Sequence, residues 1–361
     1  MLLYIAIIFF LIFALLIDIR NAKTVGVCKV DSAKIFQRHA AIVILLFLWF
    51  LTAFRSTSIG NDTPVYVRYF QNIDSYGVDE NYAIEMGFQF LIRLIGKFTD
   101  DPHIFLVVMA TINYGLLSYI IFKNSENCLI SLILTFFLCY GSFCNIIRQS
   151  LAMLICFIAY IKFKNNRIIL FVGLVLFAAL FHTSALVVLL LLLYKYIPKN
   201  GYFIVGACCV AILLSHTSFL INISHMLGDE YTGYFTGKYA NSGYLGTFLS
   251  LLRLVLIYFV IRSSSGDRQY LSEKEYNIVY TSSFFALFFL CCGFTVNIIS
   301  RISDYFVIFS IIEIPNALKK KVGNQKNIFF AMLLAYMIVH FIVVQIFRPE
   351  WNHLYPYSLW N

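Results

Sequence analysis

The chain has 361 residues, of which 61% are apolar, 18% aromatic and only 12% charged. Soluble domains carry about 25% charged residues, so this composition excludes a soluble enzyme and is typical of a polytopic membrane protein. The formal net charge is +9, but the basic residues lie between apolar runs and form no face interleaved with aromatic side chains, which argues against binding of nucleic acid. The nine cysteines show no metal-ligand spacing, so we predict no metal site.

The first apolar run, 1–17, has no basic residue before it, and a basic cluster follows it from Arg20 to Arg38. This order predicts an uncleaved first helix with its N-terminus outside, because basic loops stay in the cytoplasm. Counting apolar runs against the roughly 20 residues that cross a bilayer predicts one all-α membrane domain over 1–361 with about twelve transmembrane helices. The predicted spans are 1–18, 39–54, 103–122, 127–143, 149–161, 168–181, 183–197, 202–221, 244–262, 277–297, 301–318 and 328–347.

The loops between these spans carry opposite charges on the two sides. This map places 18 of the 27 basic residues inside and 11 of the 18 acidic residues outside, so the sidedness is consistent along the chain. Two long segments, 55–102 and 222–246, are then extracytoplasmic. The first contains an amphipathic stretch after Glu85, which predicts a helix in the outer interface. The second contains Gly228 to Phe235, which suits either sugar stacking or an interfacial aromatic belt.

Residues 168–196 form an apolar stretch of about 29 residues that a single tilted helix could cover. Both of its flanks are basic, and Phe181 to Ser184 form a polar break in its middle. We therefore predict a hairpin, because two basic flanks favour the same side of the membrane. His182 would then line a cavity near the outer surface.

Arginines occur where the positive-inside rule does not expect them, at the outer ends of predicted spans. They are Arg55, Arg148 and Arg301. A guanidinium binds a diphosphate through two parallel hydrogen bonds and stays charged where water is scarce. The alternative is that each arginine reaches the interface or pairs with a nearby carboxylate, from Asp62, Glu85 or Asp304.

Glu85 and His182 are the candidates for proton transfer. Glu85 could instead cap the following helix or bind a sugar, and His182 could be a packing residue. Arg253 lies within a predicted span, and Glu313 is its expected partner in a structural ion pair.

Five short motifs follow one another along most of the chain, from about Arg55 to Phe306. They are R-x4-G-x-D-x3-Y from Arg55 to Tyr66, E-x-G-F from Glu85, N-x2-R-Q-x-L-A from Asn145, F-H-x-S-A from Phe181 and R-x2-D-Y-F from Arg301. Their order and spacing resemble the EpsG-like branch of the Wzy-type polysaccharide polymerases.

The resemblance implies a GT-C-like helical enzyme of the bacterial inner membrane with an outward-facing site. It would transfer a growing exopolysaccharide, capsule or O-antigen chain from polyprenyl diphosphate to the next lipid-linked repeat unit. No cofactor is expected, and the implied partners are the polyprenyl-diphosphate-linked oligosaccharide, membrane lipid and a chain-length regulator. The alternatives are a flippase or transporter, an O-antigen-type ligase and a non-catalytic assembly subunit.

The resemblance also suggests roles for the site residues. The departing diphosphate needs arginines, and the attacking hydroxyl needs a base, which is either Glu85 or His182. The residues assigned to diphosphate or sugar binding are Arg55, Asp62, Tyr66, Arg148, Gln149, Arg301, Asp304 and Tyr305.

Overall fold

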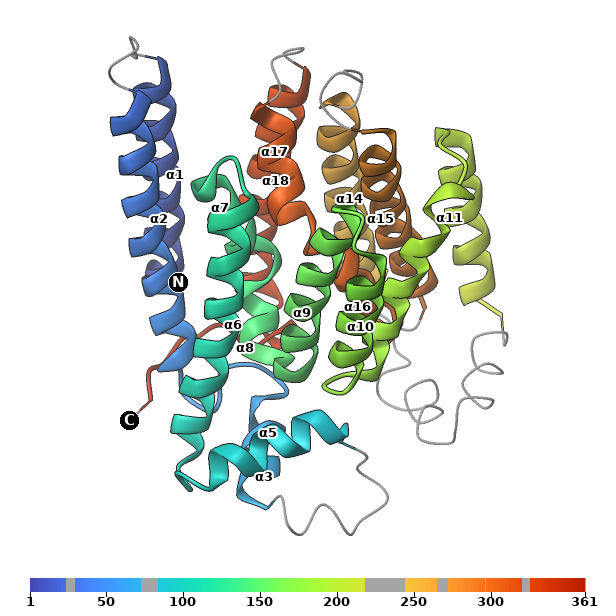
Figure 1. The fold of residues 1–361 in the computed structure, drawn as a ribbon. Helices are drawn as coiled ribbons and strands as arrows, with labels where there is room; N and C mark the ends of the chain where they lie inside the picture. The colour runs from blue at the N-terminus through green and yellow to red at the C-terminus, as the bar shows by residue number, and fades with distance from the viewer. Residues whose placement is uncertain are drawn as a thin grey trace.

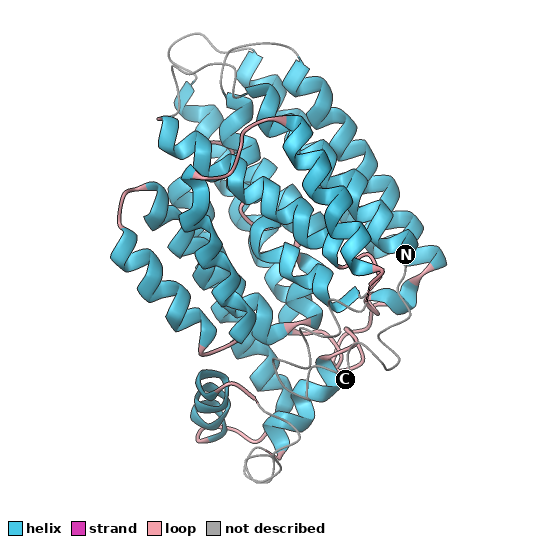
Figure 2. Cartoon of the chain, turned by 90° about the vertical axis from the view of Figure 1, so that its right-hand side faces the viewer, coloured by secondary structure: helices cyan, strands magenta, loops and turns pink. Residues whose placement is uncertain are grey.

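The computed structural model describes residues 1–23, 30–72, 84–217, 244–264, 272–295, 297–319 and 325–360, which are helical throughout apart from turns and short irregular segments (Figure 2). No strand occurs among these residues. The helices are α1 (Leu2–Lys23), α2 (Val30–Ala53), α3 (Thr63–Gln71), α5 (Met86–Gly96), α6 (Pro102–Asn124), α7 (Cys128–Leu138), α8 (Tyr140–Asn145), α9 (Ile147–Lys164), α10 (Ile168–Ala179), the 3₁₀ helix η2 (Thr183–Lys195), α11 (Gly201–Ser215), α14 (Tyr244–Ser264), α15 (Glu273–Cys292), α16 (Asn297–Val307), α17 (Ser310–Lys319), α18 (Gln325–Phe347) and the 3₁₀ turn η3 (Pro349–Trp351).

Among the described residues, six helices are long and apolar enough to cross a membrane: α1, α2, α6, α14, α15 and α18. The other predicted spans coincide with shorter helices, so the all-helical membrane fold is confirmed and the number of crossings stays a prediction. Two predicted spans, 127–143 and 301–318, are not continuous. The first breaks between α7 and α8 at Cys139, and the second breaks between α16 and α17 after Val307. Broken helices at membrane depth leave main-chain groups free for a polar interior.

The predicted hairpin over 168–196 is present, with α10 and η2 as its arms and residues 180–182 as its turn. The second arm is a 3₁₀ helix of 13 residues, although such helices are seldom longer than four. A 3₁₀ helix rises about 2.0 Å per residue, so this arm reaches roughly 26 Å, against about 20 Å for an α-helix of equal length. A short segment thereby spans most of the roughly 30 Å hydrocarbon core.

The described residues that border the predicted inside loops lie at one end of the bundle, and those that border the predicted outside segments lie at the other (Figure 1). At the first end, Asn127 donates to Asp18 at 2.8 Å, which joins the start of α7 to α1. At the second end, the Tyr4 hydroxyl donates to the carbonyl of Leu354 at 2.6 Å, so the two chain ends meet. Helices α3 and α5 lie at this second end. Which end faces the cytoplasm stays a prediction.

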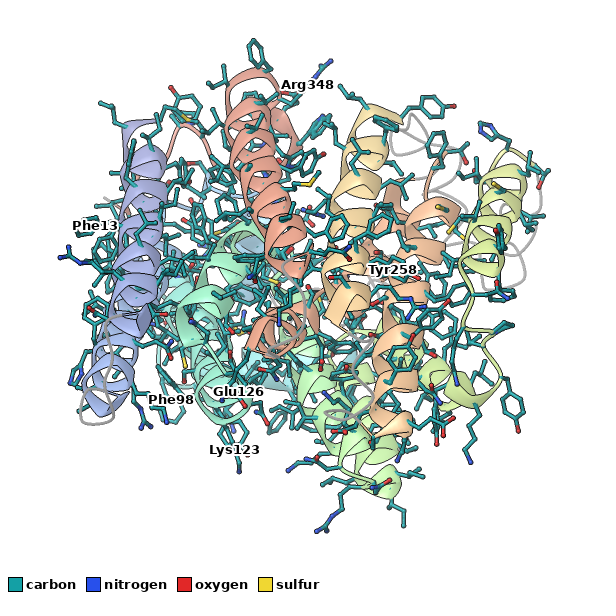
Figure 3. All side chains as sticks on the ribbon, turned by 90° about the horizontal axis from the view of Figure 1, so that it is seen from above. Phe13, Phe98, Lys123, Glu126, Tyr258 and Arg348 are labelled. Carbon is teal, nitrogen blue, oxygen red and sulfur yellow. The ribbon has the colours of Figure 1, made fainter. Side chains whose placement is uncertain are left out.

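The outward faces of the peripheral helices are apolar. Phe13 on α1 points away from the bundle (Figure 3) and is 62% exposed. On α5, Met86, Phe90 and Phe98, just after the helix, are also exposed, whereas Phe88 and Ile92 are fully buried. This division gives α5 one face against the bundle and one apolar outer face, as expected for a helix in the membrane interface.

Candidate functional site

The start of α5 is docked against the turn of the α10–η2 hairpin. The Gly87 N–H donates to the Leu180 carbonyl at 2.8 Å. A Cβ at residue 87 would lie 2.7 Å from that carbonyl oxygen, so only glycine permits this approach. The contact explains the glycine of the E-x-G-F motif: it brings Glu85 to the residues that follow Leu180.

Glu85 is the centre of a charged cluster that joins three distant segments. Its Oε2 lies 2.5 Å from Nη1 of Arg148, and its Oε1 lies 2.8 Å from Nδ1 of His182. The Thr183 N–H also donates to Oε1, at 3.2 Å. Glu85 is the N-cap residue of α5 but makes no side-chain capping bond, so the alternative in which it only caps the helix is wrong. Its carboxylate is engaged by stronger, charge-assisted donors.

Burial of Glu85 would by itself raise the pKa of its carboxyl group. The hydrogen bond from His182 and the positive charge of Arg148 outweigh burial, and the pKa is lowered below its ordinary value of 4.5. Glu85 is therefore ionised at neutral pH. The guanidinium of Arg148 also lies 5.9 Å from the centre of the Tyr66 ring and 6.0 Å from that of Phe88, which stabilises the cation further.

The imidazole of His182 has one nitrogen engaged and one available. A carboxylate accepts hydrogen bonds only, so Nδ1 of His182 must carry the proton in its contact with Glu85. Nε2 is then the nitrogen left to accept a proton from another molecule. The His182 side chain is 27% exposed, so a reactant can reach it.

A second ion pair lies beside this cluster. Nη1 of Arg301 is 3.3 Å from Oδ2 of Asp62, and both side chains are about one-third exposed. The Asp62 N–H donates to the side chain of Asn145 at 2.7 Å, while Gln149 donates to the Arg301 carbonyl at 2.7 Å. The segment around the start of α9 therefore positions both members of the pair.

Gly60 shapes the loop that carries Asp62. Its φ of +90° lies in the region that favours glycine, and a Cβ there would be 2.5 Å from the Cys144 carbonyl. The loop thus passes directly over the end of α8.

Tyr66 connects the two ion pairs. Burial raises the pKa of the Tyr66 hydroxyl, and this effect is larger than those of the nearby charges of Arg148, Asp62 and Arg301. Tyr305 is fully buried and accepts a hydrogen bond from Ser184 at 3.2 Å. This bond attaches the start of η2 to α16. The buried Tyr305 side chain has no exposed surface with which to contact a sugar.

Arg55 is also held by the main chain. Its side chain is 1% exposed and donates to the carbonyls of Thr52 and, at 3.0 Å, Cys144. The predicted diphosphate contact stays untested for Arg55, but this guanidinium now has a structural task, joining the end of α2 to α8.

The expected ion pair between Arg253 and Glu313 is wrong. Glu313 instead pairs with Lys164 at 2.7 Å and accepts from the Tyr160 hydroxyl at 3.0 Å, since α17 brings it against the end of α9. Arg253 lines a cavity of about 300 Å³ together with Asp304, Arg301 and His340.

Sequence reasoning missed the segment after α18, which crosses the site end of the bundle. The Gly60 N–H donates to the His353 carbonyl at 3.1 Å, and the Trp360 N–H donates to the Phe54 carbonyl at 2.9 Å. The Trp360 ring stacks on His103 with 3.9 Å between ring centres. Three aromatic residues within 355–360 and the two prolines after α18 were the only available signals.

The described residues contain no group of three His, Cys, Asp or Glu side chains placed to hold a metal ion. The predicted sugar-contacting stretch from Gly228 to Phe235 lies outside the described residues. What the site offers is a histidine backed by a carboxylate, next to two arginines at one end of a helical bundle. This arrangement can remove a proton and stabilise a developing negative charge.

Comparison with known proteins identifies a family over most of this architecture. The sequence model described as the EpsG family matches residues 39–359, which include every residue of the charged cluster. No curated protein and no solved structure matches the chain significantly. Because the match covers nearly the whole chain, this membrane protein belongs to the EpsG family, and that membership indicates a polysaccharide polymerase-type role.

Proposed function

We propose that this protein polymerises polyprenyl-diphosphate-linked oligosaccharide repeat units on the extracytoplasmic face of the membrane. The growing chain is the donor: the bond between its first sugar and the diphosphate breaks, and a hydroxyl of the next repeat unit forms the new glycosidic bond. The hydroxyl proton goes to the base, and the polyprenyl diphosphate departs as an anion. The family membership and the position of the charged cluster support this reaction.

The contact between His182 and Glu85 is the observation that carries the proposal. It favours His182 over Glu85 as the base, because Glu85 is already occupied by His182, Arg148 and the Thr183 N–H. In this reading Glu85 orients the imidazole and stabilises its protonated form, with Nε2 facing the acceptor hydroxyl. Arg148 holds Glu85 in place.

Arg301 is the arginine placed to contact the departing diphosphate. It is 38% exposed, and its ion-pair partner among the described residues, Asp62, is at 3.3 Å, which is long for a charge-assisted bond. A diphosphate can therefore compete for the guanidinium. Asp62 lies beside it and is one-third exposed, so we assign Asp62 the positioning of a sugar, whereas Tyr66 is buried and supports the arginines.

Deletion of the gene, followed by gel analysis of surface polysaccharide, tests the proposal. Loss of the polymerase should leave single repeat units on the lipid or on the cell surface, because supply and export of the units continue. Restoration of long chains by the intact gene, but not by His182→Gln at equal protein level, would assign the loss to this site. Loss of all surface material would instead indicate a flippase or a ligase.

A transporter of lipid-linked oligosaccharide is the second candidate, because α7–α8 and α16–α17 are discontinuous helices bordering a polar cavity. Such helices are common at the binding sites of transporters. Transporters also use histidine and carboxylate side chains as proton relays, so it is the family membership that favours the polymerase as our proposal. The same deletion experiment separates the two, since a flippase mutant accumulates no unit outside.

A further inference from the structure

The cavity of about 300 Å³ lies between the two broken helices and is separate from the Glu85 contacts. Its walls come from α7, α8, α14, α15, α16, α18 and the segment after α18. Four of its side chains can carry charge: Arg253, Arg301, Asp304 and His340.

Arg253 is the unexplained residue of this cavity. It lies in the middle of α14, and its buried Nε has no hydrogen-bond partner among the described residues. Leaving a guanidinium nitrogen unsatisfied in an apolar surrounding is costly. Asp304 is close enough to feel the charges of both Arg253 and Arg301, whereas Arg301 also has Asp62 as an ion-pair partner.

An anionic ligand would give Arg253 the hydrogen-bond partner that its buried Nε lacks within the described part of the chain. Two guanidinium groups on different helices suit a ligand with two anionic centres, since each fork can bind one of them through parallel hydrogen bonds.

We propose that this cavity binds the diphosphate of the lipid-linked donor, held between Arg253 and Arg301. The inference rests on the proposed function and deepens it, because Arg301 is the residue that links the cavity to the Glu85 cluster. The diphosphate leaves the donor sugar on the cavity side, while the acceptor hydroxyl is deprotonated on the His182 side. Arg253 thereby becomes a binding residue for the leaving group.

Binding of farnesyl diphosphate, a short soluble prenyl diphosphate, to the purified full chain in lipid nanodiscs tests this assignment. We expect Arg253→Gln to weaken binding at least tenfold and farnesyl monophosphate to bind more weakly than the diphosphate. Arg262→Gln is the matched control, because Arg262 lies on the same helix, is exposed and donates to the Tyr276 hydroxyl outside the cavity. It should leave the affinity unchanged.

Asp304→Asn separates ligand binding from a structural ion pair. If Asp304 only opposes the anion, its neutralisation should keep or raise the affinity for farnesyl diphosphate. If Arg253 and Asp304 are only a structural pair, Asp304→Asn and Arg253→Gln should both lower the melting temperature and neither should change diphosphate affinity selectively, which would overturn the inference.

Arg253→Lys is the substitute if Arg253→Gln does not accumulate. Lysine keeps the charge but loses the fork, so several-fold weaker binding is expected, and wild-type affinity would refute the assignment. Failure of the wild-type chain to bind farnesyl diphosphate would also refute it. Normal binding by Arg253→Gln, together with single repeat units after gene deletion, would overturn this inference alone. Weakened binding by Arg253→Gln, together with no single repeat units after gene deletion, would overturn only the proposed polymerase function.

Discussion

Substitution of Gly87 by alanine tests whether the docking of α5 on the hairpin positions the catalytic groups. The new Cβ would lie 2.7 Å from the Leu180 carbonyl oxygen and 2.9 Å from the Leu180 Cβ. Ordinary contact begins at 3.4 Å, so the start of α5 and the hairpin turn must separate by about 0.7 Å. Glu85 and His182 lie on opposite sides of this contact, and their hydrogen bond of 2.8 Å would stretch to the limit of a hydrogen bond.

The expected effect on activity exceeds the effect on stability. Overpacking costs about 1–3 kcal/mol, which a protein with a typical stability of about 5–15 kcal/mol tolerates. A misplacement of about 1 Å in a catalytic site costs about 10²-fold in rate, so we expect a loss of roughly ten- to a hundredfold. The assay measures long-chain polymer and single repeat units in a deletion strain that expresses the variant, with protein level followed by immunoblot.

Gly96→Ala is the matched control. Gly96 ends the same helix, and a Cβ there meets no atom within 4 Å. Both substitutions gain the same helix propensity, about 1 kcal/mol, so only the clash differs between them. Wild-type amounts of polymer from Gly87→Ala would refute the positioning argument. Disappearance of the Gly87→Ala protein would refute the estimate that stability survives.

His182→Gln keeps size and a hydrogen bond but cannot take a proton, so polymer should fall about 10²-fold at normal protein level; near-normal polymer would shift the base to Glu85. Arg148→Lys and Arg301→Lys keep the charge but lose the planar fork, and both should lose most polymer; long chains from both would remove the roles assigned to them. The pKa of Glu85 is lowered in the folded protein, so its ionised carboxylate should stabilise the fold fully at neutral pH. This stabilisation should disappear as the pH falls below 4.5 and through the pKa of Glu85 in the folded protein. A melting-temperature difference between wild type and Glu85→Gln that does not change with pH would contradict the ion pair. A cysteine at Gln71 should react with an impermeant reagent from outside and one at Asn165 only after permeabilisation; the opposite pattern would invert the topology.

Hydropathy was sufficient to predict where the helices lie. The hairpin over 168–196 followed from its two basic flanks and from the break at Phe181 to Ser184, because charge and polarity act locally on membrane insertion. Hydropathy could not predict that η2 is a 3₁₀ helix, nor that the predicted spans 127–143 and 301–318 break, since the residues at the two breaks, Cys139 and Ile308 with Phe309, are themselves apolar.

The sequence singled out Glu85, Arg148 and His182 but not their pairing. Their contacts join residues 63 and 97 positions apart, and such pairings depend on how helices pack rather than on local pattern. The same reason explains the wrong partner for Arg253: Glu313 lies in the middle of a predicted span, but in the packed structure it pairs with Lys164. The motif glycines indicate which segments meet. Gly60 and Gly87 lie at the two points where one main-chain segment passes close to another to form the site.

The segment after α18 has a consequence for the order in which the protein assembles. Its contact between Leu354 and Tyr4 joins residues 350 positions apart, and translation proceeds at about 5–20 residues per second. Leu354 is therefore synthesised roughly 20–70 s after the first helix, and until then the Tyr4 hydroxyl cannot make this hydrogen bond. Helices α1 and α2 must be stable in the membrane without that segment, and the outer surface around Gly60 and Phe54 closes only after α18 has been made. A substitution in 349–360 should thus affect the maturation of the site while leaving insertion of the earlier helices intact.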